Sequence, residues 1–242
     1  MLHRKAQKGL QGVMPVRLML LVFLMSLVLS GCQSFRPHTE IPFINGAIAE
    51  SLSSNASVSF VSSGKSASGN GFFMYRKPDQ MRMVVLSPFG SVLQEVYVSG
   101  EAVTIIDTGN GIAFSGSYRD LPEKGDLTAW RYVNWLIDVD PPDVTRGTAV
   151  VERVNKFGEP EKAQFVNGML ISKSTAAAGF VHYDSYTEVQ GVVFPLEIRY
   201  ETVAKEKFII RLDDPELNGS FADGAFMPNL SKLRVYPLSA LQ

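Results

Sequence analysis

The feature that most constrains the fold is a two-residue alternation of apolar and polar side chains, which begins near Ser57 and returns through most of the later chain. Turn residues interrupt this alternation about every 8–12 residues. Alternation of this period places successive side chains on opposite faces of a strand. We therefore expect a mainly β protein with few helices (α+β), built on a meandering antiparallel sheet that curves into a barrel or half-barrel. No internal repeat and no second domain boundary occur, so residues 43–242 should form one domain.

The expected strands begin with two hairpins, in which residues 72–75 pair with 81–86 and residues 92–98 pair with 102–106. Residues 64–71, which are rich in Gly and Ser, are expected to form a flexible turn. Later strands are expected at residues 149–154, 162–166, 169–172, 179–186, 193–202 and 205–212. Before the first strand, residues 41–52 have a helical spacing of apolar side chains, with Ile44, Ala47, Ile48 and Leu52 on one side.

The first hairpin is apolar on both of its faces. If Pro78 and Asp79 form a two-residue turn, one face carries the side chains of Phe72, Met74, Met81, Met83 and Val85. The other face then carries Phe73, Tyr75, Val84 and Leu86, with Arg82 among them. A sheet is apolar on both faces when both are covered, or when one face lines a ligand cavity. The pattern therefore allows either a β-sandwich covered by helices or a cavity lined by Phe72, Met74, Met81, Met83 and Val85.

A single strong helix pattern follows these strands, at residues 127–137, with Asp126 as the expected N-cap. Both tryptophans of the chain lie in this segment. Trp130 and Val133 share one side with Leu136 and Ile137, whereas Tyr132 and Trp135 point elsewhere. Such a wide apolar stripe suits a lid over a half-barrel, with Trp130, Val133 and Trp135 lining the cavity. A helix simply packed on the sheet explains the same pattern.

The segment between the second and third expected strands contains Pro88 and Gly90, which favour a tight turn with Phe89 at its tip. Exposure of a large aromatic side chain costs about 1.5–3 kcal/mol relative to burial. That cost is recovered if the loop of Pro88, Phe89 and Gly90 enters a bilayer. The alternative is a turn that folds inward and buries Phe89 in the core.

The N-terminus has the three parts of a secretory signal peptide: a basic start, an apolar run of about a dozen residues and small residues before Cys32. A spanning helix needs about 20 apolar residues. Leu29-Ser30-Gly31-Cys32 resembles the bacterial lipobox, which predicts removal of residues 1–31 and acylation of Cys32. Residues 32–42 would then be the acylated N-terminus and a short tether. Because Gln33, and not Asp, follows the cysteine, we expect a lipid-anchored protein on the periplasmic face of the outer membrane.

Composition excludes several other classes of function. The net charge is −1, and it becomes −5 once residues 1–31 are removed, so nucleic acid is not an expected partner. One Cys and three His leave little material for a metal site, and no cofactor is expected. No Gly-x-Ser-x-Gly sequence occurs, His182 alternates within a strand, and Asp213-Asp214 reads as a turn. We therefore expect a protein that is not an enzyme.

The residues from Gly71 to Ser91 resemble the signature region of LolB, the outer-membrane receptor of lipoprotein sorting. The segments around Trp135, from Phe180 to Tyr186, from Phe194 to Ile198 and from Lys207 to Leu212 are similar to later elements of that family. The resemblance spans about residues 45–220, and the segment after Phe221 is more similar to the related periplasmic carrier.

The resemblance implies an eleven-stranded half-barrel closed by a helical lid over a cavity for acyl chains. It implies that Phe89 takes the place of the family's protruding apolar loop residue. It further implies that the protein receives acylated lipoproteins from a LolA-like periplasmic carrier and inserts them into outer-membrane lipid. The alternative is an envelope scaffold, or a general lipid-binding lipoprotein of the same fold.

Overall fold

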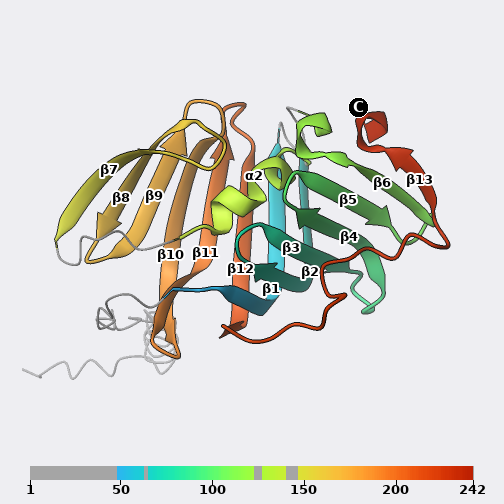
Figure 1. Ribbon diagram of the computed structural model, residues 1–242, viewed down its shortest axis with the longest axis horizontal. Helices are drawn as coiled ribbons and strands as arrows, with labels where there is room; N and C mark the ends of the chain where they lie inside the picture. Colours follow the sequence, from blue (N-terminus) through green and yellow to red (C-terminus); the bar gives the residue numbers. More distant parts are fainter. Residues whose placement is uncertain (1–47, 63–64, 123–126, 140–146, 242) are drawn as a thin grey trace, which may run out of the picture. The chain divides into compact units, whose positions relative to one another are not determined.

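The computed structural model describes residues 48–62, 65–122, 127–139 and 147–241 (Figure 1). Cys32, the predicted signal peptide and the predicted tether of residues 32–42 lie outside these ranges. Within the described ranges no helix is long and apolar enough to cross a membrane.

The described chain folds into one open, curved sheet of thirteen strands, not the eleven that the family resemblance implies. The strands are β1 (Ser51–Ser62), β2 (Lys65–Arg76), β3 (Gln80–Leu86), β4 (Val92–Ser99), β5 (Ala102–Asp107), β6 (Ile112–Ser117), β7 (Thr148–Val154), β8 (Pro160–Val166), β9 (Met169–Thr175), β10 (Gly179–Val189), β11 (Val192–Thr202), β12 (Lys207–Leu217) and β13 (Arg234–Pro237). Helix α2 (Thr128–Ile137) and the short 3₁₀ helices η1 (Tyr118–Asp120) and η2 (Leu238–Leu241) complete the described elements. The prediction of a mainly β, antiparallel, curved sheet is confirmed.

The sheet consists of two meanders that meet at β1. Its order is β13-β6-β5-β4-β3-β2-β1-β12-β11-β10-β9-β8-β7, so β1 pairs with β2 on one side and with β12 on the other. Neighbouring strands are antiparallel, except that β13 runs parallel to β6 at one edge. Helix α2 connects the two meanders in sequence and lies against the middle of the sheet (Figure 1).

Three local expectations are wrong. Residues 65–71 belong to strand β2 and do not form a flexible turn. The helix expected at residues 41–52 is absent from its described part, because residues 48–50 are not helical and β1 begins at Ser51. Asp213 and Asp214 lie inside β12, next to an irregularity in the β1–β12 register, and do not end the strand.

The face assignment in the first hairpin is also wrong. Three residues, not two, connect β2 to β3, so that Arg76 pairs with Gln80, Tyr75 with Met81 and Phe73 with Met83. A shift of one residue moves every side chain of a strand to the opposite face. Phe73 and Tyr75 therefore share the core face with Met81, Met83 and Val85, whereas Phe72 and Met74 face the other way.

The second face of strands β4 to β6 is partly covered by the C-terminal segment and not by a helical layer, whereas Phe72 on the second face of the hairpin is 47% exposed. After β12 the chain crosses to β13 at the far edge of the first meander, as Figure 1 shows in red. Leu230 and Leu233 pack against the outward side chains of Tyr97, Ile106 and Ala113, which form a small apolar cluster separate from the main core. The apolar character of the outward face is thereby explained for β4 to β6.

Candidate functional site

Helix α2 is the element on which the candidate site is built. The side chains of Trp130, Val133, Trp135, Leu136 and Ile137 are buried in the main core between the helix and the sheet. The Trp135 ring packs edge-on against Tyr200 of β11, with ring centroids 6.3 Å apart. All of these side chains face protein, including Trp135, which the sequence pattern had placed on another side of the helix.

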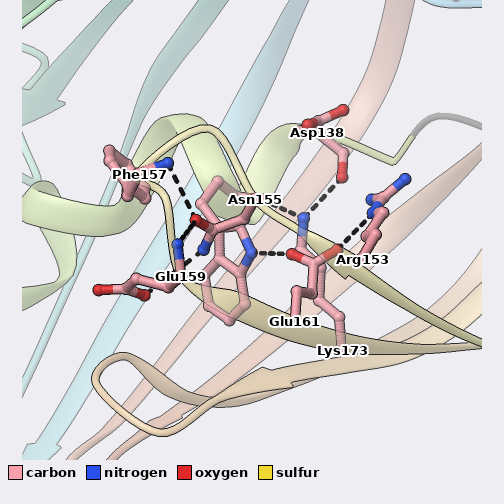
Figure 2. A network of polar contacts seen from close by, with 8 residues as sticks. Asp138, Arg153, Asn155, Phe157, Glu159, Glu161 and Lys173 are labelled. Carbon is pink, nitrogen blue, oxygen red and sulfur yellow. Dashed lines mark hydrogen bonds and ion pairs between the residues drawn. The ribbon is translucent and has the colours of Figure 1, made fainter.

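A buried polar network holds the C-terminal end of α2 (Figure 2). The Nζ of Lys173 on β9 donates to the carbonyl oxygens of Trp135 and Asp138, the latter at 2.7 Å. The hydroxyl of Tyr183 on β10 donates to the Leu136 carbonyl at 2.8 Å. Positive charge at a helix C-terminus interacts favourably with the helix dipole. These contacts satisfy carbonyl groups that the helix itself leaves without partners.

The same network fixes the Trp135 side chain. Its indole Nε1 donates to Glu161 on β8, and the other carboxylate oxygen of Glu161 accepts from Arg153 Nε of β7 at 2.7 Å. Figure 2 shows the Glu161 carboxylate with a dashed line to the indole nitrogen on one side and to Arg153 on the other. One helix is therefore tied to four consecutive strands, β7 to β10.

Burial governs the acid–base properties of this network. Lys173 is only 1% exposed. Burial disfavours its charged form and lowers the pKa of Lys173 to about 8, while the charges of Asp138 and Glu161 act in the opposite direction. Burial also raises the pKa of the Tyr183 hydroxyl well above its ordinary value. Near pH 7 the network therefore contains a charged ammonium and a neutral phenol.

Helix α2 is also hydrogen-bonded to η1 and to the β2–β3 turn. Arg131 donates to the Arg119 carbonyl of η1 at 3.3 Å, and the Asn134 side chain donates to the Asp79 carbonyl at 3.1 Å. Leu127 occupies the N-cap position and makes no capping bond with its side chain. Asp126, the expected N-cap, lies outside the described residues.

The candidate cavity residues have two different environments. Met81, Met83, Trp130, Val133 and Trp135 are buried in the core, and Val85 packs against it. Phe72 and Met74 lie on the opposite face of the sheet. A cavity of about 700 Å³ occurs elsewhere, and its lining includes none of these eight residues: it is lined by Thr128, Arg131, Tyr132, Ala176, Ala177, Ala178, Tyr200, Thr202, Val203, Ala204 and Glu206.

The loop between β3 and β4 presents Phe89 to solvent, with 96% of the residue's surface exposed. The backbone N–H of Gly90 donates to the Ser87 carbonyl at 2.9 Å, and the Ser87 N–H donates to the Ser91 carbonyl at 2.8 Å. Gly90 has φ of 82°, a conformation that favours glycine. The interpretation of Phe89 as a core residue is wrong, since the turn projects it outward on a hydrogen-bonded base.

Other candidate chemical groups are placed as follows. His182 lies within β10, where it pairs with Ser172 and Arg199 on its neighbouring strands. No group of His, Cys, Asp and Glu side chains suited to a metal ion occurs in the part of the chain that the structure describes.

The Lys173 network and the 700 Å³ cavity were missed by sequence reasoning. Both bring together segments that are far apart in the chain, and the sequence contains only a weak indication of each. For the network the signal is a lysine in an otherwise uncharged strand, and for the cavity it is three consecutive alanines at a turn.

Comparison with known proteins relates the chain to others through its fold. No family model matches the sequence, and no curated protein matches it significantly. A LolA superfamily protein from Nitrosomonas europaea has a similar structure, with a TM-score of 0.54 and 12% identity over 75% of this chain and 92% of that one.

Two further solved structures have the same arrangement. A Vibrio parahaemolyticus protein, described as an outer membrane lipoprotein-sorting protein domain, gives a TM-score of 0.57 at 6% identity and covers 73% of this chain and 89% of that one. A DUF1329 family protein from Desulfovibrio piger gives 0.55 at 10% identity, over 74% and 90%. At these identities the similarity is one of fold: the chain has a LolA-like fold.

Proposed function

We propose that this protein is a LolB-like, non-enzymatic lipoprotein, anchored to the outer membrane through acylated Cys32, that receives acylated lipoproteins from a LolA-like periplasmic carrier. It then passes their acyl chains to outer-membrane lipid. The lipobox-like sequence, the family resemblance and the shared fold of a described lipoprotein-sorting domain support the proposal. The direction of transfer is set by the relative affinities of the carrier, this protein and the membrane for the acyl chains. A transfer protein cannot move cargo from a site of higher affinity to one of lower affinity.

The observation that carries the proposal is the exposure of Phe89. An exposed phenylalanine forgoes about 1.5–3 kcal/mol of burial free energy, which contact with the apolar part of a bilayer would recover. Its neighbours Pro88, Ser87, Gly90 and Ser91 carry no charge that would oppose entry into a bilayer. The loop would contact lipid and lower the barrier for release of the acyl chains.

Acyl-chain binding by a half-barrel requires α2 to act as a lid that moves. In the observed state the inner face of the sheet is occupied by the side chains of α2 itself. The contacts of Lys173, Glu161 and Tyr183 hold this state closed. Acyl chains would replace the apolar side of α2 on the sheet, so the observed state is the one before cargo arrives.

The scaffold function is the second candidate, and the packed interior favours it. A protein that binds partners only through its surface needs no cavity between helix and sheet, and α2 fills that space. The two candidates differ in whether the acyl chains of a lipoprotein are needed for binding.

Native mass spectrometry separates them. The Cys32→Ala full-length chain, purified without detergent, is mixed with a lipoprotein in its acylated and non-acylated forms. Transfer predicts a complex with the acylated form alone. Equal binding of both forms, or of neither, would reject the receptor function in favour of the scaffold. In cells, Cys32→Ala should move the protein from the membrane to the soluble periplasmic fraction, and unchanged membrane partition would contradict the predicted anchor.

The loop is tested with Phe89→Glu, and Phe180→Glu is the matched control because Phe180 is a half-exposed phenylalanine on β10. We expect Phe89→Glu to bind acylated cargo normally and to slow its insertion into liposomes at least fivefold. Phe180→Glu should insert cargo at the wild-type rate. A large loss of thermal stability in Phe89→Glu, or equal insertion by both variants, would overturn the role of the loop.

A further inference from the structure

The 700 Å³ cavity lies at the N-terminal half of α2, against two neighbouring hairpin turns of the second meander. One turn connects β9 to β10 and contributes Ala176, Ala177 and Ala178. The other connects β11 to β12 and contributes Val203 and Ala204. Small-molecule sites typically have volumes of about 300–1,000 Å³, so the cavity is large enough to hold an organic ligand.

The rim of this cavity is apolar in a place where polar residues are the rule. Hairpin turns are dominated by Gly, Asn, Asp, Ser and Pro. Here Ala176, Ala177 and Ala204 are exposed, and Val203 is 60% exposed. Two adjacent turns that both expose small apolar side chains create a surface suited to an aliphatic chain that leaves the cavity.

The lining of the cavity includes an acidic and a basic residue, Glu206 and Arg131. Glu206 is only 6% exposed, and its Oε1 accepts a hydrogen bond from the Ser62 hydroxyl at 3.1 Å. Arg131 donates from Nη2 to the Arg119 carbonyl. A guanidinium has five N–H donors, so Arg131 can keep this bond and still bind an anionic group.

Tyr200 lines the cavity together with these two charged residues. Its hydroxyl donates to the Ala178 carbonyl at 2.6 Å. Burial raises the pKa of Tyr200, and among the weaker effects Glu206 raises it further while Arg131 lowers it. Tyr200, Glu206 and Arg131 all line the same cavity.

We infer that this cavity binds the head group of a zwitterionic amphiphile, with its ammonium group at Glu206, its phosphate or carboxylate at Arg131 and its aliphatic chain over the alanine and valine rim. An aliphatic chain alone would remove water from Arg131 and would add no interaction to Arg131 or to the buried carboxylate of Glu206. A head group with both charges adds a charge-assisted hydrogen bond at each end. The site goes beyond the proposed transfer function and does not depend on it.

The test uses calorimetric titration of the detergent-free Cys32→Ala chain with four probes below their micellar concentrations. These are lauroyl lysophosphatidylethanolamine, laurate, dodecylamine and free phosphoethanolamine. We expect the lysolipid to bind at least tenfold more tightly than each of the other three. Equal binding of laurate would show that apolar contact alone is recognised, and equal binding of phosphoethanolamine would show a site for a free metabolite; either result overturns the lipid assignment.

Matched variants locate the binding. Ala177→Trp fills the rim at an exposed position and should weaken lysolipid binding at least tenfold, whereas Ala222→Trp, at an exposed position of the C-terminal segment, should not. Arg131→Gln should weaken the lysolipid at least fivefold and leave dodecylamine unchanged. Glu206→Gln should weaken both, and Glu201→Gln, outside the cavity lining, should weaken neither. Thermal unfolding confirms that each variant is folded.

These experiments distinguish a failure of the head-group site from a failure of the proposed transfer function. If Ala177→Trp binds the lysolipid as well as the parent chain does, the cavity is not the site and the inference is wrong. If the parent chain forms a complex with acylated lipoprotein but does not bind the lysolipid, the head-group site fails and the transfer function stands. Loss of lysolipid binding in Ala177→Trp with retained binding of acylated lipoprotein supports two separate sites.

Discussion

Lys173 connects the last turn of α2 to the sheet with a single buried ammonium group. Isolated buried charges are costly, and they persist in proteins where hydrogen bonds and opposite charges compensate for the lost water. Here two carbonyl oxygens bind the ammonium directly, and the carboxylates of Asp138 and Glu161 favour its charged form. The residue therefore acts on the position of the helix and not on a ligand.

Replacement of Lys173 by Met should destabilise the fold by about 1–3 kcal/mol at pH 7, because the carbonyls of Trp135 and Asp138 lose their donor while they remain largely buried. Chemical denaturation measures the change. Lys162→Met, at an exposed position of the neighbouring strand β8, is the control and should change stability by less than about 0.5 kcal/mol. Equal effects at the two positions would contradict a structural role for the Lys173 contacts.

Stability should rise with pH above pH 8 because of the same residue. The pKa of Lys173 is about 8 in the fold and 10.5 in its unperturbed state, so between these values the unfolded chain binds more protons and deprotonation favours folding. From pH 7.5 to pH 9.5 the free energy of unfolding should increase by about 2 kcal/mol. Lys173→Met should lack this increase in urea denaturation. Above pH 10 the sign reverses, because the pKa of the buried Tyr183 is raised and its hydroxyl remains protonated only in the fold.

At the scale of elements, the β2–β3 hairpin shows that sequence patterns predict the positions of strands better than they predict which face of the sheet each side chain occupies. Strand positions follow from alternation, and β3, β4 and β5 lie where the sequence predicts them, within one residue at either end. The length of the turn was assumed, and one additional residue reversed the orientation of Phe72 to Tyr75. Because both faces are apolar, hydrophobicity could not decide between the two registers.

The C-terminal segment could not be anticipated from local pattern. Its apolar residues do not recur with the period of a strand or a helix. Its role follows from the fold, in which Leu230 and Leu233 pack on the apolar outward face of β4 to β6. Phe226 is 4% exposed, with its ring against Phe221, at a centroid distance of 5.1 Å, and with the Arg76 guanidinium 4.9 Å from its centroid. It anchors the segment next to the β2–β3 turn.

Phe226→Ala should therefore lower the free energy of unfolding by about 3 kcal/mol, the usual cost of truncating a buried phenylalanine. Met227→Ala is the control. Met227 follows Phe226 in the chain and is 72% exposed, so its side chain should contribute less than about 0.5 kcal/mol to the free energy of unfolding. Binding of a hydrophobic dye should increase in Phe226→Ala alone. A Phe226→Ala protein as stable as Met227→Ala would show that the segment does not contribute to the fold through this residue.

At the scale of the whole molecule, α2 carries both tryptophans of the chain, so tryptophan fluorescence reports on this helix alone. If acyl chains displace α2, titration with an acylated lipoprotein should shift the emission to longer wavelength as Trp130 and Trp135 become hydrated. The non-acylated form is the control and should leave the spectrum unchanged. Binding of the acylated form without a spectral change would contradict the movement of α2.

The sequence was sufficient for the mainly β class, the antiparallel meander and the position of α2, whereas for Phe89 it left both an exposed loop tip and a buried core position open. It was insufficient for the Lys173 network, which combines α2 with strands β7 to β10, and for the cavity at Glu206, which combines α2 with β11 and two hairpin turns. Such sites depend on which strands become neighbours. Here they also depend on where α2 packs on the second meander, which no local pattern reports.

The central position of β1 has a consequence for how the chain folds during synthesis. Leu52 is paired with Leu217, so the seam between the two meanders cannot close until almost the entire polypeptide has been made. The first meander can assemble early, but the backbone groups on one edge of β1 then stay unpaired until β12 has been made. During that time this edge can pair with the strands of other chains. Contacts of such long sequence separation slow folding. Substitutions along the seam are therefore expected to change the yield of folded protein in cells more than the stability of the protein once it is folded.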